Sequence, residues 1–323
     1  IASGYYLASG KLGCVYLQNA GLGNMVNPLT SLCDKEVYGI PALLIIGWRG
    51  EPGGGHDEPQ HIKMGKITLP LLDTLEIPYG FLPDNLDGAK NIILNAKKFM
   101  ETESAPYAIV VKKDLFEKFV GKKNDSENFE ITREEAIKII ADALPQDAVI
   151  VSTTGKTSRE LFEYRKTKGD SRGKDFLTVG SMGFASAIAF GIAQAEKNKK
   201  IVVFDGDGAA LMHLGNMATI GHFAPANFLH IIFDNRAYES TGGQPSISAS
   251  VDFKKLAQSL KYKNSYIVDN EKDLTEIMPK AVKTAGPVLL TIRVKSGSRA
   301  DLGRPDKSPQ ENKKDFMESL QKI

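Results

Sequence analysis

The chain has few cysteines, little net charge and no long apolar run. Its 323 residues include only Cys14 and Cys33, too few for a disulfide framework, which favours a reducing compartment, the cytoplasm. Both lie among apolar neighbours, so we expect two buried thiols. The 41 basic and 39 acidic side chains leave a formal charge of +2, which predicts no binding to nucleic acid or to a membrane surface. The expected partner is a small molecule.

Even the apolar stretch 41–48, PALLIIGW, is far shorter than the roughly 18 residues that a membrane-spanning helix needs. We therefore expect a soluble protein. The chain begins with Ile1 in IASGYYLASGK, a segment typical of the last turns of an amphipathic helix that ends at Gly10. Because a native start normally carries Met, we expect further sequence upstream, and the lack of a signal peptide says little about targeting.

The sequence does contain two blocks in which strand and helix patterns alternate, and this predicts two Rossmann-like α/β domains with doubly wound parallel sheets. The first, 1–113, has strands expected at 14–18, 42–48 and 107–113 and a helical segment at 87–103. Between them lies the loop 49–61, RGEPGGGHDEPQH, whose length and composition are typical of functional loops. The polar stretch 114–130 is the expected linker.

The second block, 131–297, opens with a capping-box pattern at Thr132 and Glu135. Strands are expected at 148–153, 227–235 and 286–294, a small-residue helix at 181–197, and at 200–208 a strand that runs into a turn. Lys199 and Lys200 are expected to be solvated. The remaining residues, 298–323, form a charged tail.

The strongest chemical pattern is a pair of strands that each end in polar residues. One runs into Gly206, Asp207 and Gly208, and the next ends at Asp234 and Asn235. Ligands bind at the carboxyl edge of parallel sheets, where glycines let a phosphate approach the backbone. The Asp207 carboxylate, the Asn235 amide oxygen and a nearby backbone carbonyl can converge there, and such hard oxygen donors suit Mg²⁺ that also binds phosphate.

The segment 206–235, GDGAALMHLGNMATIGHFAPANFLHIIFDN, resembles the signature of thiamine diphosphate enzymes. The resemblance implies thiamine diphosphate and Mg²⁺ as cofactors, with Asp207, Asn235 and the Ala237 carbonyl as metal ligands. It further implies that Gly206 and Gly208 contact the cofactor.

Two other segments resemble the same family. In 179–193, VGSMGFASAIAFGIA, the resemblance implies that the Gly180 carbonyl accepts a hydrogen bond from the aminopyrimidine, that Ser181 binds the cofactor and that Met182 separates its two rings. A methionine packed in the core is the alternative. The segment 152–158, STTGKTS, lacks the glycine spacing of an ATP-binding loop. The resemblance implies instead that Thr153, Thr154 and Gly155 contact the cofactor's phosphate or pyrimidine.

The front half, GYYLASGKLGCVYLQNAGLGN, is similar to the pyrimidine-binding domain of these enzymes. In the family, a glutamate on the preceding helix activates the cofactor. The first glutamate here is Glu36, which follows the glycine-rich turn. We therefore expect the activating glutamate to lie upstream of Ile1.

The loop WRGEPGGGHDEPQH, the segment DNRAYESTGGQPSIS and the lack of a third domain resemble the phosphonopyruvate decarboxylase family. This implies decarboxylation of a small-molecule 2-oxo acid, 3-phosphonopyruvate, to phosphonoacetaldehyde and CO₂ in phosphonate biosynthesis, by a homo-oligomer. Arg49 and His61 are the catalytic candidates in this chain. The substrate candidates, which include donors for a dianion, are Arg49, Gln60, His61, Ser240 and Gln244, with His56 in the same loop.

Two alternatives stay open. A sulfopyruvate decarboxylase would share the AYESTGGQP segment, and a cofactor-binding subunit or fragment without catalysis would fit the missing glutamate. A nicotinamide dehydrogenase is disfavoured because no GxGxxG follows a first strand with an acidic residue at the right distance.

Overall fold

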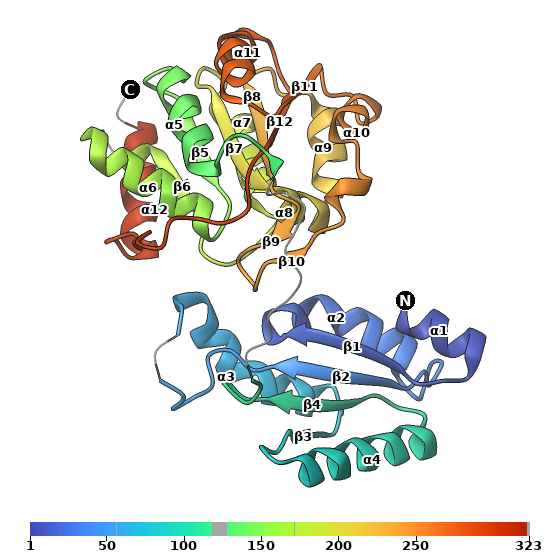
Figure 1. Cartoon of the computed structure of the whole chain (residues 1–323). Coiled ribbons are helices and arrows are strands. Elements are labelled where there is room, and N and C mark those ends of the chain that lie inside the picture. The colour runs from blue at the N-terminus through green and yellow to red at the C-terminus, as the bar shows by residue number, and fades with distance from the viewer. Residues whose placement is uncertain (56, 118–127, 171, 322–323) are drawn as a thin grey trace. The chain divides into compact units, whose positions relative to one another are not determined.

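The computed structural model describes residues 1–55, 57–117, 128–170 and 172–321 (Figure 1). The chain divides into two compact units, 1–120 and 121–323, and each is described here by itself. Ten of the residues in the expected linker, 118–127, lie outside the described residues, as do His56 and the last two residues of the expected tail. Within the described residues, no helix is both long and apolar enough to cross a membrane.

Unit 1 contains, within its described residues, a four-stranded sheet in the order β1-β2-β4-β3, and all its strand pairs are parallel. The strands are β1 (Gly13–Gln18), β2 (Ala42–Gly47), β3 (Tyr79–Phe81) and β4 (Tyr107–Val111). The helices are α1 (Ala2–Ser9), α2 (Leu22–Pro28), α3 (Pro59–Thr74) and α4 (Leu86–Glu103). α2 and α3 contribute to the core on one face of the sheet, and α4 packs on the other.

Unit 2 contains, within the part of the chain that is described, a six-stranded parallel sheet in the order β11-β12-β8-β7-β5-β6. Its strands are β5 (Val149–Ser152), β6 (Asp175–Leu177), β7 (Ile201–Gly206), β8 (Phe228–Asp234), β11 (Asn264–Val268) and β12 (Val288–Arg293). A short antiparallel pair, β9 (Ala237–Tyr238) and β10 (Gln244–Pro245), follows β8.

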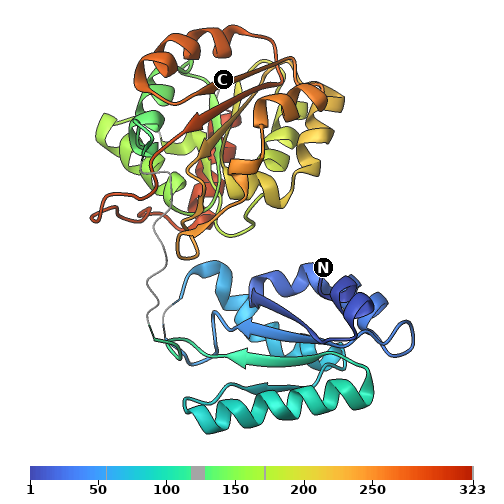
Figure 2. The same ribbon diagram turned by 45° about the vertical axis from the view of Figure 1, so that its right-hand side comes forward.

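Helices cover both faces of this sheet (Figures 1 and 2). α5 (Arg133–Ala143), α6 (Lys156–Lys168) and α11 (Glu271–Lys283) pack on one face. The other face carries α7 (Ala185–Ala195), α9 (Gly215–Phe223), α10 (Phe253–Ser259) and α12 (Pro309–Gln321). The long apolar runs of β7 and β8 are buried for this reason, as expected of parallel strands covered on both sides. The predicted fold class is confirmed.

The sheet order reverses next to β5. The chain goes from β5 through α6 to β6 on one side, and then through α7 to β7 on the other side of β5. Such a switch point leaves a crevice at the carboxyl ends of the two strands, where ligands of open α/β sheets bind. The short helix α8 (Asp207–Met212) begins there, directly after β7.

Several local expectations are confirmed and others are wrong. Thr132 and Glu135 form the predicted capping box of α5, and α1 ends at Gly10. However, α1 buries none of its residues, so it is not the expected amphipathic helix. Cys33 is buried as expected but Cys14 is exposed, because it lies on the edge strand β1.

The expected loop 49–61 ends early, because α3 begins at Pro59. Proline suits a first helical turn, where its missing N–H has no intrahelical partner to lose. Gln60 and His61 therefore lie on a helix. Gly65 lets this helix approach the loop, because a Cβ there would lie 1.7 Å from the Gly50 carbonyl oxygen.

The segment expected as a charged tail contains α12, which belongs to the core of unit 2. Phe316 is buried in it. The Asn312 side chain accepts a 3.1 Å hydrogen bond from the Leu177 N–H and donates a 3.0 Å bond to the Asp175 carbonyl on the edge strand β6. Lys199, expected in solvent, is 7% exposed and donates to the Leu320 carbonyl at 2.7 Å.

We expect Asn312→Ala to destabilise unit 2 by about 1–3 kcal/mol, because it leaves buried backbone groups of β6 without partners. The exposed neighbour Lys313 provides the control, since Lys313→Ala keeps α12 and removes no such bond. Urea unfolding of both variants measures the difference. Equal midpoints in the two variants would show that α12 does not secure the edge of the sheet.

Candidate cofactor site

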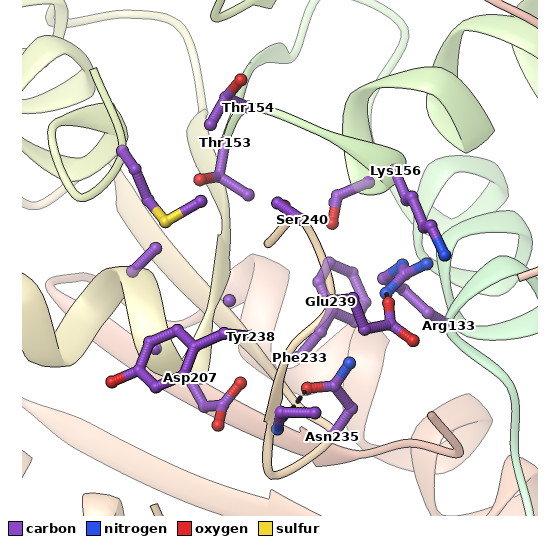
Figure 3. A pocket seen from close by; sticks show the side chains of 16 residues that line it. Arg133, Thr153, Thr154, Lys156, Asp207, Phe233, Asn235, Tyr238, Glu239 and Ser240 are labelled. Carbon is purple, nitrogen blue, oxygen red and sulfur yellow. Dashed lines mark hydrogen bonds and ion pairs between the residues drawn. The ribbon is translucent and has the colours of Figure 1, made fainter. Parts of the chain in front are cut away.

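A partly open pocket lies in unit 2 at the switch point of the sheet (Figure 3). Its lining comes from the ends of β7 and β8, from segments that follow β5, β6, β7 and β8, and from the start of α5. The lining residues are Arg133, Thr153, Thr154, Lys156, Thr157, Met182, Gly206, Asp207, Gly208, Ala209, Phe233, Asn235, Ala237, Tyr238, Glu239 and Ser240. Most of the residues that the sequence predicts to bind the cofactor or metal therefore share one pocket.

Asp207 is the first residue of α8 and is 1% exposed. The sequence predicts a turn here, but the helix begins at once. The Ser246 hydroxyl donates to the carboxylate, and Ser248 in turn donates to Asp234 at 2.7 Å. Burial raises the pKa of Asp207 to about 6; the Ser246 hydrogen bond opposes this shift, and the Asp234 carboxylate adds to it. A bound cation would favour the charged form of Asp207.

Asn235 follows the last residue of β8 and is 5% exposed. Its side-chain oxygen accepts a 3.0 Å hydrogen bond from the Ala237 N–H, and its main-chain oxygen accepts one from Ser296 at 3.0 Å. These bonds fix the turn that brings Ala237 to the pocket. Figure 3 shows the side chains of Asp207 and Asn235 on the same side of the pocket. Among the described residues, no three His, Cys, Asp or Glu side chains form a metal-binding group.

The turn between β5 and α6 contains Thr153, Thr154 and Gly155, and Figure 3 shows Thr153 and Thr154 on the opposite side of the pocket. Gly155 has φ +101°, and a Cβ there would lie 2.7 Å from the Ser240 hydroxyl oxygen. Only glycine therefore allows this turn and Ser240 to approach each other. The Thr154 hydroxyl accepts a 3.1 Å bond from the Gly180 N–H, which ties this turn to the next predicted segment.

The segment 180–182 begins five residues before α7 and is not helical, although the sequence predicts a helix from Ser181. Gly180 and Ser181 both have positive φ, +72° and +45°. This backbone places Met182 in the pocket, while Gly180 and Ser181 are outside the set of lining residues. The alternative for Met182, a core methionine within the helix, is wrong because the residue precedes α7.

The pocket also contains a buried ionic cluster that the sequence did not reveal. Arg133, the first residue of α5, is 5% exposed and donates to Glu160 at 2.7 and 2.9 Å and also to Glu239. Burial opposes the charged guanidinium, but the bonds to both carboxylates outweigh it and raise the pKa of Arg133. Glu239 also accepts from the Gly297 N–H, so the cluster fixes the segment after Ala237.

The remaining candidates are divided between the two units. Ser240 lines the pocket, whereas Gln244 does not; it is exposed and bonds to Thr241 in its own turn. In unit 1, the Arg49 guanidinium donates to both Asp57 oxygens. The hydrogen bond from Arg49 holds the pKa of Asp57 well below its usual range. Asn19 bonds to the Arg49 backbone at 2.9 and 3.2 Å and so fixes the start of this loop.

Gln60 and His61 lie in the first turn of α3. His61 is 7% exposed, and burial lowers the pKa of its imidazole, an effect to which the nearby Arg49 charge adds. His61 Nδ1 and Gln60 Oε1 are buried and have no hydrogen-bond partner among the described residues. Unpaired buried polar atoms are uncommon in folded proteins, so these two mark an unusual place in unit 1.

Four lining residues carry side-chain chemistry that sequence reasoning missed: Arg133, Lys156, Tyr238 and Glu239. Lys156 directly follows the predicted cofactor turn, and Tyr238 and Glu239 directly follow the predicted metal ligand. Proximity along the chain could have identified these three. Arg133 gives no such signal, because it is 106 residues away from Glu239.

Comparison with known proteins identifies the family. The family described as "Thiamine pyrophosphate enzyme, C-terminal TPP binding domain" matches residues 153–292. Phosphonopyruvate decarboxylase from Streptomyces viridochromogenes is 36% identical over 326 residues, 96% of this chain and 80% of that protein. The protein of the same name from Streptomyces hygroscopicus is 37% identical over 333 residues, 98% of this chain and 80% of that protein. Sulfopyruvate decarboxylase from Methanosarcina acetivorans is 28% identical over 345 residues, 99% of this chain and 85% of that protein.

The matched range 153–292 begins at the turn after β5 and includes β7 and β8, so it contains nearly all of the pocket. The relatives extend the similarity over almost the whole chain, including unit 1. These decarboxylases are more than a third identical to it. The chain therefore belongs to the phosphonopyruvate decarboxylase family of thiamine pyrophosphate enzymes, which are carboxy-lyases.

Proposed function

We propose that this protein is a thiamine diphosphate- and Mg²⁺-dependent decarboxylase that converts 3-phosphonopyruvate to phosphonoacetaldehyde and CO₂. The pocket at the switch point of unit 2 carries the proposal, because it gathers oxygen donors and glycines at one sheet edge within the matched cofactor-binding range. The two phosphonopyruvate decarboxylases among the relatives support the choice of substrate.

The residues of the pocket fit a magnesium ion that is shared with a diphosphate. Asp207 offers a carboxylate, Asn235 an amide oxygen and Ala237 a backbone carbonyl, which are hard oxygen donors. Mg²⁺ in proteins usually has one or two carboxylate ligands and takes further ligands from phosphate and water. A site with a single carboxylate suits this pattern. Ser246 and the Ala237 N–H orient the Asp207 and Asn235 oxygens respectively.

The cofactor would lie along the edges of β5 and β7. A Cβ on Gly206 would meet no atom within 4 Å, so space is open beside the backbone at this edge. Thr153, Thr154 and Gly155 would contact its phosphate or pyrimidine, with Gly180, Ser181 and Met182 near its rings and Gly208 beside the diphosphate. When bound, thiamine diphosphate supplies an electron sink for the carbanion left by CO₂. The protein binds and orients the cofactor and excludes water from it.

The substrate candidates in unit 1 are Arg49, Gln60 and His61, and those in unit 2 are Ser240 and Gln244. Arg49 engages Asp57 through Nε and Nη2, and its side chain keeps 41% exposure, so part of the guanidinium can still meet an anion. His61 and Gln60 each offer a buried atom without a partner among the described residues. His61, with its lowered pKa, favours the neutral imidazole and suits a proton acceptor near neutral pH.

Homo-oligomer formation and a cytoplasmic location stay predictions. Among the relatives, sulfopyruvate decarboxylase of Methanococcus maripaludis comprises subunits named alpha and beta, which match 34% and 60% of this chain. Those matches also support sulfopyruvate decarboxylation as the second candidate function. The sulfonate of that substrate carries one charge fewer than a phosphonate dianion.

We expect Asp207→Ala to abolish Mg²⁺-dependent binding of thiamine diphosphate while the fold persists, since the metal loses its carboxylate. Isothermal titration calorimetry measures binding, and circular dichroism checks the fold. Asp147→Ala, at an exposed position of the same unit, is the control and should bind like the wild type. Unchanged cofactor affinity in Asp207→Ala would contradict the proposed metal site.

We expect kcat/KM to fall in the order phosphonopyruvate, sulfopyruvate, pyruvate. Pyruvate has only a methyl group where the others carry an anion, and a site built for polar partners can reject such an analogue by factors up to about 10⁴. CO₂ release from each acid under matched conditions gives the order. Equal values for pyruvate and phosphonopyruvate would overturn the substrate assignment, and a preference for sulfopyruvate would favour the second candidate.

We also expect Arg49→Ala to lower kcat/KM for phosphonopyruvate roughly 10- to 100-fold, the loss of one charge-assisted hydrogen bond, and to affect pyruvate less. Lys112→Ala is the matched control, because Lys112 is a half-exposed cation of the same unit that pairs with Glu51 at 2.9 Å. If both substrates lost the same factor in Arg49→Ala, Arg49 would not be the residue that recognises the anionic group.

A further inference from the structure

One cation of the pocket has no carboxylate partner. Four charged side chains among the described residues line the pocket: Arg133, Lys156, Asp207 and Glu239. Arg133 is bound by two carboxylates, those of Glu160 and Glu239. Within the described residues, Lys156 makes neither a hydrogen bond nor an ion pair. Lys156 is therefore the cation that the pocket itself does not neutralise.

The charges around Lys156 are otherwise unfavourable for a phosphate group. Arg133 carries one positive charge against the two negative charges of Glu160 and Glu239, and Asp207 adds another negative charge. A diphosphate that entered with one Mg²⁺ would still carry excess negative charge. Without Lys156, the described lining would present a net acidic surface to this group, which would repel it. The lysine thus has an electrostatic reason to be in this pocket.

The local backbone directs Lys156 to the pocket. It is the first residue of α6, a helix of 13 residues whose first turn has no acidic side chain and whose N-cap, Gly155, provides no side-chain cap. The Gly155 turn and the bond from Ser158 Oγ to the Thr153 carbonyl at 2.7 Å hold this helix start against β5. Lys156 enters the pocket from α6 alongside the Arg133 cluster (Figure 3). Thr157, the next residue, is buried and also lines the pocket.

We propose that Lys156 binds the diphosphate of the cofactor and neutralises the negative charge that Mg²⁺ leaves unmatched, an inference that rests on the proposed function. A phosphonate dianion offers the same chemistry, so the substrate is the other possible source of the group that Lys156 contacts. The diphosphate is favoured because Lys156 shares its pocket with Asp207, Asn235 and Ala237, and Mg²⁺ bound by these residues would hold phosphate oxygens there.

The test is calorimetric titration of the whole chain with thiamine diphosphate in excess Mg²⁺. We expect Lys156→Gln to weaken binding roughly 10- to 100-fold, the effect of one charge-assisted hydrogen bond, and Lys156→Arg to recover part of the loss. Affinity of the Gln variant should also depend less on salt. The control is Lys166→Gln, on the last turn of the same helix, where Lys166 is exposed and pairs with Asp306 at 3.2 Å. It should bind like the wild type.

A second measurement separates the two sources of the dianion. With saturating cofactor, Lys156→Gln should retain the wild-type ratio of kcat/KM for phosphonopyruvate over pyruvate. Unchanged cofactor affinity with a loss of that ratio would assign Lys156 to the substrate and overturn the proposal. Equal loss of affinity in Lys156→Gln and Lys166→Gln would also overturn it, because general charge would then explain the effect. A protein that carries the expected upstream glutamate and binds the cofactor but does not decarboxylate would instead refute the proposed function.

Discussion

The parallel pairing of β7 with β5 and β8 at the switch point is the constraint on which the site depends. In the register of β7 and β8, Gly206 lies opposite Phe233, so the residues that follow each strand emerge together. Asp207 and Asn235 reach one pocket because their strands end at one edge, and the turn after β5 joins them there. A shift of one residue in either strand would turn its buried side chains to the other face of the sheet and separate the oxygen donors.

This arrangement has an electrostatic cost that the surrounding residues reduce. Asp207 and Asp234 are both buried at the ends of adjacent strands, with Ser246 and Ser248 bonded between them. Nearby, Arg133 holds Glu160 and Glu239 together and so connects α5, α6 and the segment after Ala237. A buried charge that lost its partner would be strongly destabilising. The pocket is therefore pre-organised by hydrogen bonds to groups that would otherwise be unpaired.

Much of this could be predicted from the sequence, where local signals were strong. The buried strands, the capping box of Thr132 and Glu135, and the polar residues at the ends of β7 and β8 follow from periodicity and spacing. The bond from Arg133 to Glu239 and the docking of α12 through Asn312 on Asp175 could not be predicted, because each pair is more than 100 residues apart along the chain. Proximity in space created by the fold leaves no periodic pattern in the chain. The start of α3 was missed for another reason, since charge and glycine in 49–61 concealed the helix signal of Pro59.

We propose that unit 2 binds thiamine diphosphate through a metal held by Asp207 and Asn235. Thermal unfolding of the wild-type chain with thiamine diphosphate, once with Mg²⁺ and once with a chelator, tests this metal dependence. A ligand at 100 times its dissociation constant adds about 2.7 kcal/mol to the stability of the state that it binds. We expect a clear rise in Tm with cofactor and Mg²⁺ together and none when the metal is chelated. The same rise with and without metal, or no rise in either case, would show that no such metal site binds the cofactor.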